Sequence, residues 1–490
     1  MNSAVKYQHR LARESWKGRP CEWHRGRGAS ARLRRVPLWL PLFLAACGHV
    51  GPDGAARAEG VPRTVDAVAM EPQGAGPVDA VATGVVIARQ PLFRAERVAR
   101  AVVVHLLHPH RVLSSATVHG GLSEHLTALV NFQSMEARAH EAKWQERSEL
   151  GRDGYQRRAT RRLGLPPEST AVLGTAAHLG HLAHVSASYR TLRVDAFVTA
   201  GVSGNAVRAS DAAQWMQGED GNEFVPDKGT INMIVLVNQP MLPGAMVKAL
   251  SVLVEGKGAA LGELAVGSRY STHLATGTGT DQVSLAAPTV GDRQPLESAS
   301  QHLKLGQLLG EVARKGVLAA LARQNGLHRE QTRNLVHALG RFGLTEEGLA
   351  ARLSGADKGS PQALLLENLA AVLREPRVAA AGYGLAAVYD RLQYGTLAPE
   401  AALEAVQDQL VVLAVAVAQR PECGWAFWRQ LQVVSPDGQH LQTVSPDGQQ
   451  PRLAGTSTDV LLGALVERVA QALQVGFAAK WHDRADQCGF

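Results

Sequence analysis

The hydrophobic periodicity of this chain changes near residue 326, and this change constrains the fold more than any other feature. Before that point, short runs rich in β-branched residues alternate with longer helical patterns. Beyond it, Ala- and Leu-rich helical segments follow one another, broken by Gly and Pro. The expected strands lie at residues 100–107, 111–116, 185–198 and 230–238, and the expected helices at 244–264, 303–324, 335–340, 364–373 and 401–418.

Strands mixed with helices predict an α/β or α+β unit. We therefore expect a mixed β-sheet core with packed helices over residues 85–325. A mainly helical C-terminal extension should follow over residues 326–490.

The N-terminal region has the pattern of an export signal. Within residues 31–47, an Arg-flanked start precedes a hydrophobic run that is too short to span a bilayer and ends in Leu-Ala-Ala-Cys. This ending resembles a bacterial lipobox, in which the chain is cut before the cysteine and the thiol is lipidated. Residues 1–47 are thus a predicted lipoprotein-type signal segment with Cys47 as the lipidation site, and residues 48–84, rich in Gly, Ala and Pro, form a tether.

This pattern predicts an exported lipoprotein anchored in the membrane and facing the periplasm. The polar residues 1–30 are longer than a signal usually allows, so a cytoplasmic location is the alternative. In an exported protein Cys423 and Cys488 could pair as a disulfide; two buried free thiols are the other option.

The net charge argues against nucleic acid as a partner. The chain has 51 Lys and Arg against 44 Asp and Glu, a net charge of +7. The first 35 residues hold ten of the bases and two of the acids, which leaves 41 minus 42, or −1, for the rest. A basic surface that follows a phosphate backbone is therefore not expected on the folded part.

Segments dense in Gly, Thr and Ser fall at expected strand ends, where backbone amides can approach a ligand. They lie at residues 113–122, 199–211, 229–232 and 275–281. In the second, a strand runs through a Gly-Ser-Gly-Asn turn toward a helix that Ser203 or Asn205 could cap. In the last, Ala-Thr-Gly-Thr-Gly-Thr-Asp, alternate glycines leave a row of hydroxyl groups that ends in a carboxylate.

Together and in this order, these segments resemble the adenosylcobinamide amidohydrolase family of corrinoid salvage. The resemblance covers roughly residues 85–325 and is most specific in the Thr-Ala-Gly-Val segment from Thr199 and the Thr-Gly-Thr-Gly-Thr-Asp segment that ends at Asp281. It includes Glu255-Gly256-Lys257, where the family prefers alanine in the middle; glycine in a helix interior costs about 1 kcal/mol.

The resemblance implies hydrolysis of the amide that joins the aminopropanol arm to the corrin ring of adenosylcobinamide, which yields adenosylcobyric acid. The corrinoid is then the substrate, and no further cofactor is expected. The candidate catalytic residues are Asp281, Lys257, His302 and Ser203, and the candidate substrate-binding residues are Ser115, Gly201, Asn205, Asn232, Thr276, Thr278 and Thr280.

Two schemes can hydrolyse an unactivated amide with these residues. In the first, a hydroxyl such as Ser114, Ser115, Ser203 or Thr278 attacks, activated by His119, His302 or Lys257. In the second, Asp281, Glu255 or a histidine activates water, with or without a metal. The Cys and His residues show no metal-ligand spacing, so no metal ligands are assigned and the metal requirement stays open. We expect Asp281 to act as base or orienter, and Asn205 with Asn232 to bind the substrate amide.

Two other classes of function compete with this hypothesis. The first is a non-catalytic lipoprotein that captures cobinamide and passes it to corrinoid transport components. The second is a nucleotide-handling protein built on the Gly-Ser-Gly-Asn turn, which has no lysine or magnesium-binding pattern beside that turn.

Overall fold

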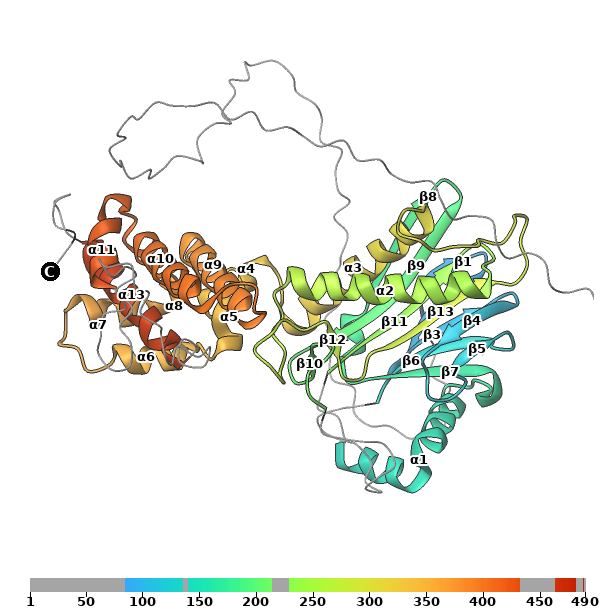
Figure 1. Ribbon diagram of the computed structural model, residues 1–490. Helices are drawn as coiled ribbons and strands as arrows, with labels where there is room; N and C mark the ends of the chain where they lie inside the picture. Colours follow the sequence, from blue (N-terminus) through green and yellow to red (C-terminus); the bar gives the residue numbers. More distant parts are fainter. Residues whose placement is uncertain (1–83, 135–139, 214–228, 432–462, 482–487, 489–490) are drawn as a thin grey trace, which may run out of the picture. The chain divides into compact units, whose positions relative to one another are not determined.

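A computed structural model describes residues 84–134, 140–213, 229–431, 463–481 and 488 (Figure 1). All of them belong to one compact unit, Pro77–Phe490. The predicted signal segment (1–47) and all but the last residue of the predicted tether (48–84) lie outside the described residues.

Two β-sheets form the centre of the N-terminal half. The first has five strands in the order β1-β2-β3-β6-β7, antiparallel except for the β6–β7 pair. The strands are β1 (Val85–Gln90), β2 (Phe93–Val98), β3 (Ala101–Leu106), β6 (Ala128–Gln133) and β7 (Thr170–Thr175).

The second sheet has six strands in the order β5-β4-β13-β11-β9-β8. Its central pair, β11 and β13, is parallel, and the other pairs are antiparallel. The strands are β5 (Gly121–Ser123), β4 (His110–Ser114), β13 (Gln282–Pro288), β11 (Thr230–Val237), β9 (Leu192–Gly201) and β8 (Ala183–Tyr189). The predicted strand at 185–198 is thus a hairpin, because the chain turns at Arg190, which has a φ of 54°.

The two sheets pack face to face, and this packing explains why β11 is apolar from Met233 to Val237. Ile234 and Leu236 point into the core shared with the five-stranded sheet. Ile231, Met233 and Val235 point to the opposite face, into a core completed by helices. A strand covered on both faces reads as a continuous apolar run rather than an alternating one.

Helices cover the outer faces of this sandwich (Figure 1). On the six-stranded sheet lie α2 (Pro243–Glu263) and α3 (Lys304–Asn325). The predicted stripe on α3, which comprises Leu305, Leu308, Leu309 and Val312, is buried there. On the five-stranded sheet lies α1 (His140–Arg162), whose Tyr155 ring contacts Phe132 of β6. The predicted α+β class, with mixed sheets and a helical C-terminal region, is confirmed.

The secondary structure described in the C-terminal region (residues 329–479) is all helical. Its longer helices are α9 (Pro376–Gln393), α10 (Pro399–Ala418) and α13 (Leu465–Ala479). Around them lie α4 (Arg329–Thr332), α5 (Leu335–Leu339), η3 (Gly340–Phe342), α6 (Glu346–Leu353), α7 (Pro361–Glu367), α8 (Leu369–Leu373), η4 (Pro421–Cys423) and α11 (Gly424–Gln430). The predicted helix at 364–373 is divided at Asn368 between α7 and α8.

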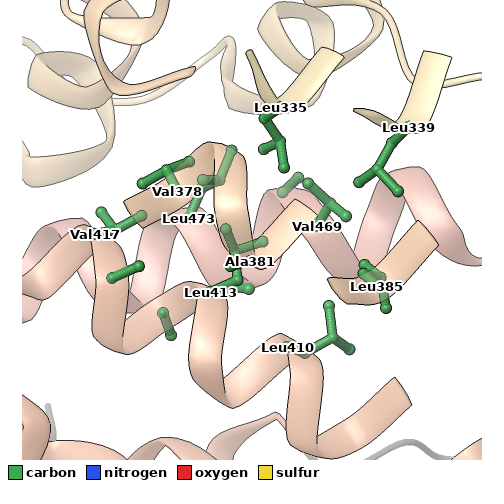
Figure 2. Packing of buried hydrophobic residues seen from close by; sticks show 14 of the residues in the cluster. Leu335, Leu339, Val378, Ala381, Leu385, Leu410, Leu413, Val417, Val469 and Leu473 are labelled. Atoms are coloured by element: carbon green, nitrogen blue, oxygen red, sulfur yellow. The ribbon is translucent and has the colours of Figure 1, made fainter. Parts of the chain in front are cut away.

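A separate hydrophobic core holds this region together. Figure 2 shows Leu410 and Leu413 of α10 among side chains from α9 and α13, including Leu385 and Val469. Among the described helices, α10 is the one that meets the length and composition criteria for a membrane span. Just over half of its most apolar window is buried against the neighbouring helices, as in the core helix of a globular region. A disulfide joins Cys423 to Cys488, which decides between the two alternatives for this pair.

Candidate functional site

The structure brings most of the predicted segments to one end of the six-stranded sheet. Thr199 and Gly201 end β9, and Thr230 and Asn232 begin the neighbouring β11 with the pairings Thr230–Gly201 and Asn232–Thr199. The parallel strand β13 begins beside them at Gln282, directly after Asp281. A two-stranded ribbon, β10 (Ala206–Val207) with β12 (Gly277–Thr278), joins the segments 199–211 and 275–281 directly.

Asp281 lies at the centre of this cluster. One carboxylate oxygen, Oδ1, accepts hydrogen bonds from the Ile231 backbone N–H (2.9 Å) and the Thr278 hydroxyl. The other, Oδ2, accepts the Thr278 backbone N–H (3.0 Å) and the Lys257 ammonium. These four donors occupy about all the positions at which a carboxylate can accept. The arrangement favours an orienting role for Asp281 over that of the group that removes a proton from water.

Lys257 reaches Asp281 from the inner face of α2. The side chains of Lys257 and Asp281 are 9% and 13% exposed, so the ion pair is largely shielded from water. Glu255, two residues earlier, lies on the exposed face of the helix because residues two apart differ by about 200° in direction. Among the described residues, Asp281 is the hydrogen-bond partner found for Lys257 Nζ, which leaves the remaining ammonium hydrogens for a ligand.

The two glycines of the Thr-Gly-Thr-Gly-Thr segment are required by close packing. A Cβ atom at Gly277 would lie 2.5 Å from Asp281 Oδ2 and 2.6 Å from Lys257 Nζ. A Cβ atom at Gly279 would lie 3.0 Å from Asn205 Oδ1. The glycines therefore let the segment pass directly over the ion pair and over the side chain of Asn205.

Asn205 is buried, and its amide links three segments. Its Nδ2 donates to the Gly229 carbonyl (3.0 Å) and to Thr280 Oγ1 (3.3 Å). Its Oδ1 accepts a hydrogen bond from the Tyr270 hydroxyl (3.1 Å). The Tyr270 side chain is partly exposed, so the Asn205–Tyr270 pair lies where the buried cluster meets solvent.

Behind the ion pair lies a chain of buried side-chain hydrogen bonds. Asn232 Nδ2 donates to Asn131 Oδ1 (3.1 Å) and to the Gly174 carbonyl (2.9 Å). Asn131 Nδ2 donates in turn to Thr199 Oγ1 (2.8 Å). Because both hydrogens of the Asn232 amide are used inside the protein, the geometry favours a supporting role for Asn232 rather than direct contact with a substrate.

Other predicted residues are held by contacts of their own. Ser203 is exposed, and its hydroxyl accepts a hydrogen bond from Asn325 at the end of α3 (2.5 Å). Ser115 Oγ accepts the Val283 N–H (2.9 Å), and Thr276 Oγ1 accepts the Ala209 N–H (2.8 Å). None of the contacts found among the described residues joins these three to Asp281.

His302 is exposed and lies just before α3. Its neighbour Gln301 contacts Glu255, on the face of α2 that points away from Lys257. The contacts found among the described residues do not bring His302 to the ion pair. The roles assigned to His302, Ser203, Ser115 and Thr276 stay predictions.

Two residues of this cluster were not predicted from the sequence. Asn131 lies in the apolar strand β6, and a buried amide inside such a run was a signal that could have found it. Tyr270 lies in an irregular loop (residues 265–276) between α2 and β12, and the sequence pattern of this loop did not point to a functional residue.

The same loop places Ser268 against Asp211. Burial alone would raise the pKa of Asp211, but hydrogen bonds led by those from Ser268 and Ser271 hold this pKa below its ordinary value.

Within the described residues, no three His, Cys, Asp or Glu side chains lie close enough together to hold a metal ion. The metal requirement therefore stays open.

A cavity of about 290 Å³ lies at the opposite end of the six-stranded sheet, where His110, Arg193, Asp195 and Pro288 line it. None of the predicted site residues lines this cavity.

A shielded ion pair, buried amides and hydroxyl groups thus meet at one end of the six-stranded sheet, which makes this cluster the candidate functional site. The model of the adenosylcobinamide amidohydrolase family matches residues 85–329, half of the chain. The chain belongs to this family of amidohydrolases, which confirms the resemblance and implies a corrinoid substrate.

Two further comparisons carry less information about function. The uncharacterized protein MJ1613 of Methanocaldococcus jannaschii is 30% identical over 182 residues, which cover 35% of this chain and 70% of that protein. The crystal structure of the PH0078 protein from Pyrococcus horikoshii aligns over 49% of this chain and 83% of its own, with 11% identity and a TM-score of 0.23. A likeness at that TM-score carries no argument about fold or function.

Proposed function

We propose that this protein hydrolyses the amide between aminopropanol and the corrin ring of adenosylcobinamide, giving adenosylcobyric acid and free aminopropanol for corrinoid salvage. Family membership supports the amidohydrolase class. The observation that carries the proposal is the shielded Lys257–Asp281 pair, which the family-specific segment 275–281 surrounds next to Asn205.

Hydrolysis adds a hydroxyl group to the amide carbon and a proton to the departing nitrogen. In our proposal Asp281 holds the Lys257 ammonium in place, and Lys257 stabilises the negative charge that develops on the amide oxygen. The ammonium can then pass a proton to the aminopropanol nitrogen, and solvent restores it. Both hydrogens of the Asn205 amide are used by Gly229 and Thr280, so Asn205 offers the released arm the acceptor position on Oδ1 that Tyr270 leaves open. The attacking group is either water, whose proton passes to solvent, or the Thr278 hydroxyl, whose proton passes to Asp281. In the second case the ester formed on Thr278 is then hydrolysed by water, which releases adenosylcobyric acid and restores the Thr278 hydroxyl.

The test is to incubate the purified full-length protein with adenosylcobinamide, with and without a chelator, and to analyse the mixture by chromatography and mass spectrometry. We expect adenosylcobyric acid and aminopropanol in equal amounts. Comparison of the reactions with and without the chelator shows whether the protein requires a metal ion. Corrinoid binding without products would overturn the proposal in favour of the capture lipoprotein.

The variant Asp281→Asn keeps the shape of the side chain and removes the charge that holds Lys257. We expect turnover to fall by about 100-fold or more, because proton transfer and charge stabilisation each contribute factors of this size, while corrinoid binding is kept. The matched control is Glu255→Gln, a change on the exposed face of α2 that should leave turnover within about twofold. Unchanged turnover in Asp281→Asn would remove Asp281 from the mechanism.

We also propose that the protein is exported and anchored through a lipid on Cys47. The Cys423–Cys488 disulfide supports export, because disulfides persist in oxidising compartments. In that setting cobyric acid would be the form handed to corrinoid transport components. The protein expressed in a bacterium should partition into the detergent phase of a Triton X-114 extraction, and Cys47→Ser should move it to the aqueous phase. A wild-type protein found in the cytosol would contradict this.

A further inference from the structure

The loop of residues 265–276 connects the C-terminal region to the candidate site. On the side of the site it carries Tyr270, whose hydroxyl donates to Asn205 Oδ1 (3.1 Å). Backbone hydrogen bonds also tie it to the ribbon strand that follows Asn205: the Arg269 N–H donates to the Ala206 carbonyl (2.9 Å) and the Thr276 N–H to the Val207 carbonyl (3.0 Å). Displacement of this loop therefore displaces the support of Asn205.

On its other side the loop is held by helices of the C-terminal region. Arg341 of η3 donates from Nη1 to the Thr272 carbonyl (2.6 Å). Gln393, the last residue of α9, donates from Nε2 to Thr272 Oγ1 (2.7 Å). Both the backbone and the side chain of Thr272 thus accept hydrogen bonds from this region.

Arg341 is itself fixed. Its guanidinium makes two parallel hydrogen bonds to the Asp390 carboxylate of α9 (2.6 and 2.7 Å), and its side chain is 5% exposed. Paired bonds of this kind hold the planar group in one orientation. The backbone packing is equally close, because a Cβ atom at Gly267 would lie 2.9 Å from the Cβ of Arg341.

Two more contacts hold the loop on either side of Thr272 in the sequence. The His337 ring of α5 makes a hydrogen bond to the Leu264 carbonyl (2.7 Å), where α2 ends and the loop begins. The Tyr394 ring, next to the end of α9, stacks on His273 with ring centroids 5.3 Å apart. Residues from α5, η3 and the end of α9 therefore hold the loop at Leu264, Thr272 and His273.

We propose that the C-terminal region serves the reaction by fixing the 265–276 loop, so that Tyr270 is a positioning residue that holds Asn205 Oδ1, the amide atom that keeps one acceptor position for the substrate. This rests on the proposed function for its catalytic consequence, but not for its structural part. Tyr270 acts through Asn205, and Thr272 acts through Tyr270. The helical region thereby contributes to the hydrolase site by positioning the loop, and it is not an independent appendage.

The experiment uses the full-length protein with Thr272→Val, which removes the acceptor for Gln393 at nearly constant shape, and Thr272→Ser, which keeps it. Hydrogen–deuterium exchange is measured on the amides of residues 265–276. We expect faster exchange in Thr272→Val, about fivefold at the Arg269 amide, and wild-type exchange in Thr272→Ser. Equal exchange in the two variants would overturn the proposal. This readout needs no substrate, so it stands even if adenosylcobinamide is not hydrolysed.

The kinetic part is a double-mutant cycle with Tyr270→Phe, which removes one hydroxyl from a partly exposed ring. Loss of one hydrogen bond should raise KM about fivefold with little change in kcat, since Asn205 binds the ground state and the transition state alike. Thr272→Val should raise KM in the wild-type background and add nothing to Tyr270→Phe. Additive effects would mean that Thr272 acts on stability alone, which would overturn the proposed route through Tyr270.

Discussion

At the scale of single residues, charged groups in this protein are held by several donors at once. Asp281 is one case, and Asp195 of β9, at the opposite end of the same sheet, is another. Asp195 accepts hydrogen bonds from His184 (3.1 Å) and from two nitrogens of Arg193 (both 2.7 Å). Burial alone would raise the pKa of Asp195, but the bonds from His184 and Arg193 outweigh it and hold the pKa below its ordinary value.

This gives a pH dependence with a definite sign. A carboxylate whose pKa is lowered by folding stabilises the protein above its unfolded pKa of about 4, and the stabilisation is lost as the pH falls through the lower folded value. We expect Asp195→Asn to lower the free energy of unfolding by about 2 kcal/mol at pH 7. The difference from wild type should shrink below about pH 4, as measured by urea unfolding across the pH range. A difference that grows on acidification would contradict this.

At the scale of secondary structure, the contact between α2 and α3 explains Gly256. By helix propensity alone, a glycine at this position costs about 1 kcal/mol. In the structure, a Cβ atom at Gly256 would lie 2.8 Å from the Gly310 carbonyl and 3.0 Å from Ala313 Cβ. The glycine lets the two helices approach closely, which keeps α2 and its Lys257 against the sheet.

Gly256→Ala should therefore destabilise the protein although alanine is the better helix former. We expect a loss of about 1–3 kcal/mol from overpacking, measured by denaturant unfolding. Gly262→Ala is the matched control on the same helix, because a Cβ atom there meets nothing within 4 Å. It should stabilise by up to about 1 kcal/mol. Stabilisation by both substitutions would show that the helices do not pack as described.

At the scale of the whole molecule, the sequence predicted elements better than the contacts between distant elements. Leu305, Leu308 and Leu309 recur at helical spacing, so periodicity alone placed α3. The motif segments were expected at strand ends, and the sheet brings them together. The pairing of Lys257 with Asp281 depends on how α2 packs on the sheet, which local pattern does not contain. The contacts between the C-terminal region and residues 265–276 likewise depend on packing between distant elements, which local pattern does not contain.

The disulfide makes a prediction at this scale. Cys423 and Cys488 are separated by 65 residues, and closing a loop of that length stabilises by about 4 kcal/mol in the chain-entropy model. Cys423→Ser should therefore lower the melting temperature of the C-terminal region, followed by calorimetry. Adding a reductant to this variant should cause no further shift, whereas the wild type should fall to the variant's value. A variant as stable as the oxidised wild type would contradict the prediction.

The same bond changes how the chain responds to a protease. A single cut anywhere between residues 424 and 487 would sever the backbone, yet the Cys423–Cys488 link would keep both fragments joined. Such nicked molecules would run as one band on a non-reducing gel and as two after reduction. Because α13 packs into the core formed with α9 and α10, a protein cut outside α11 and α13 should also retain its fold.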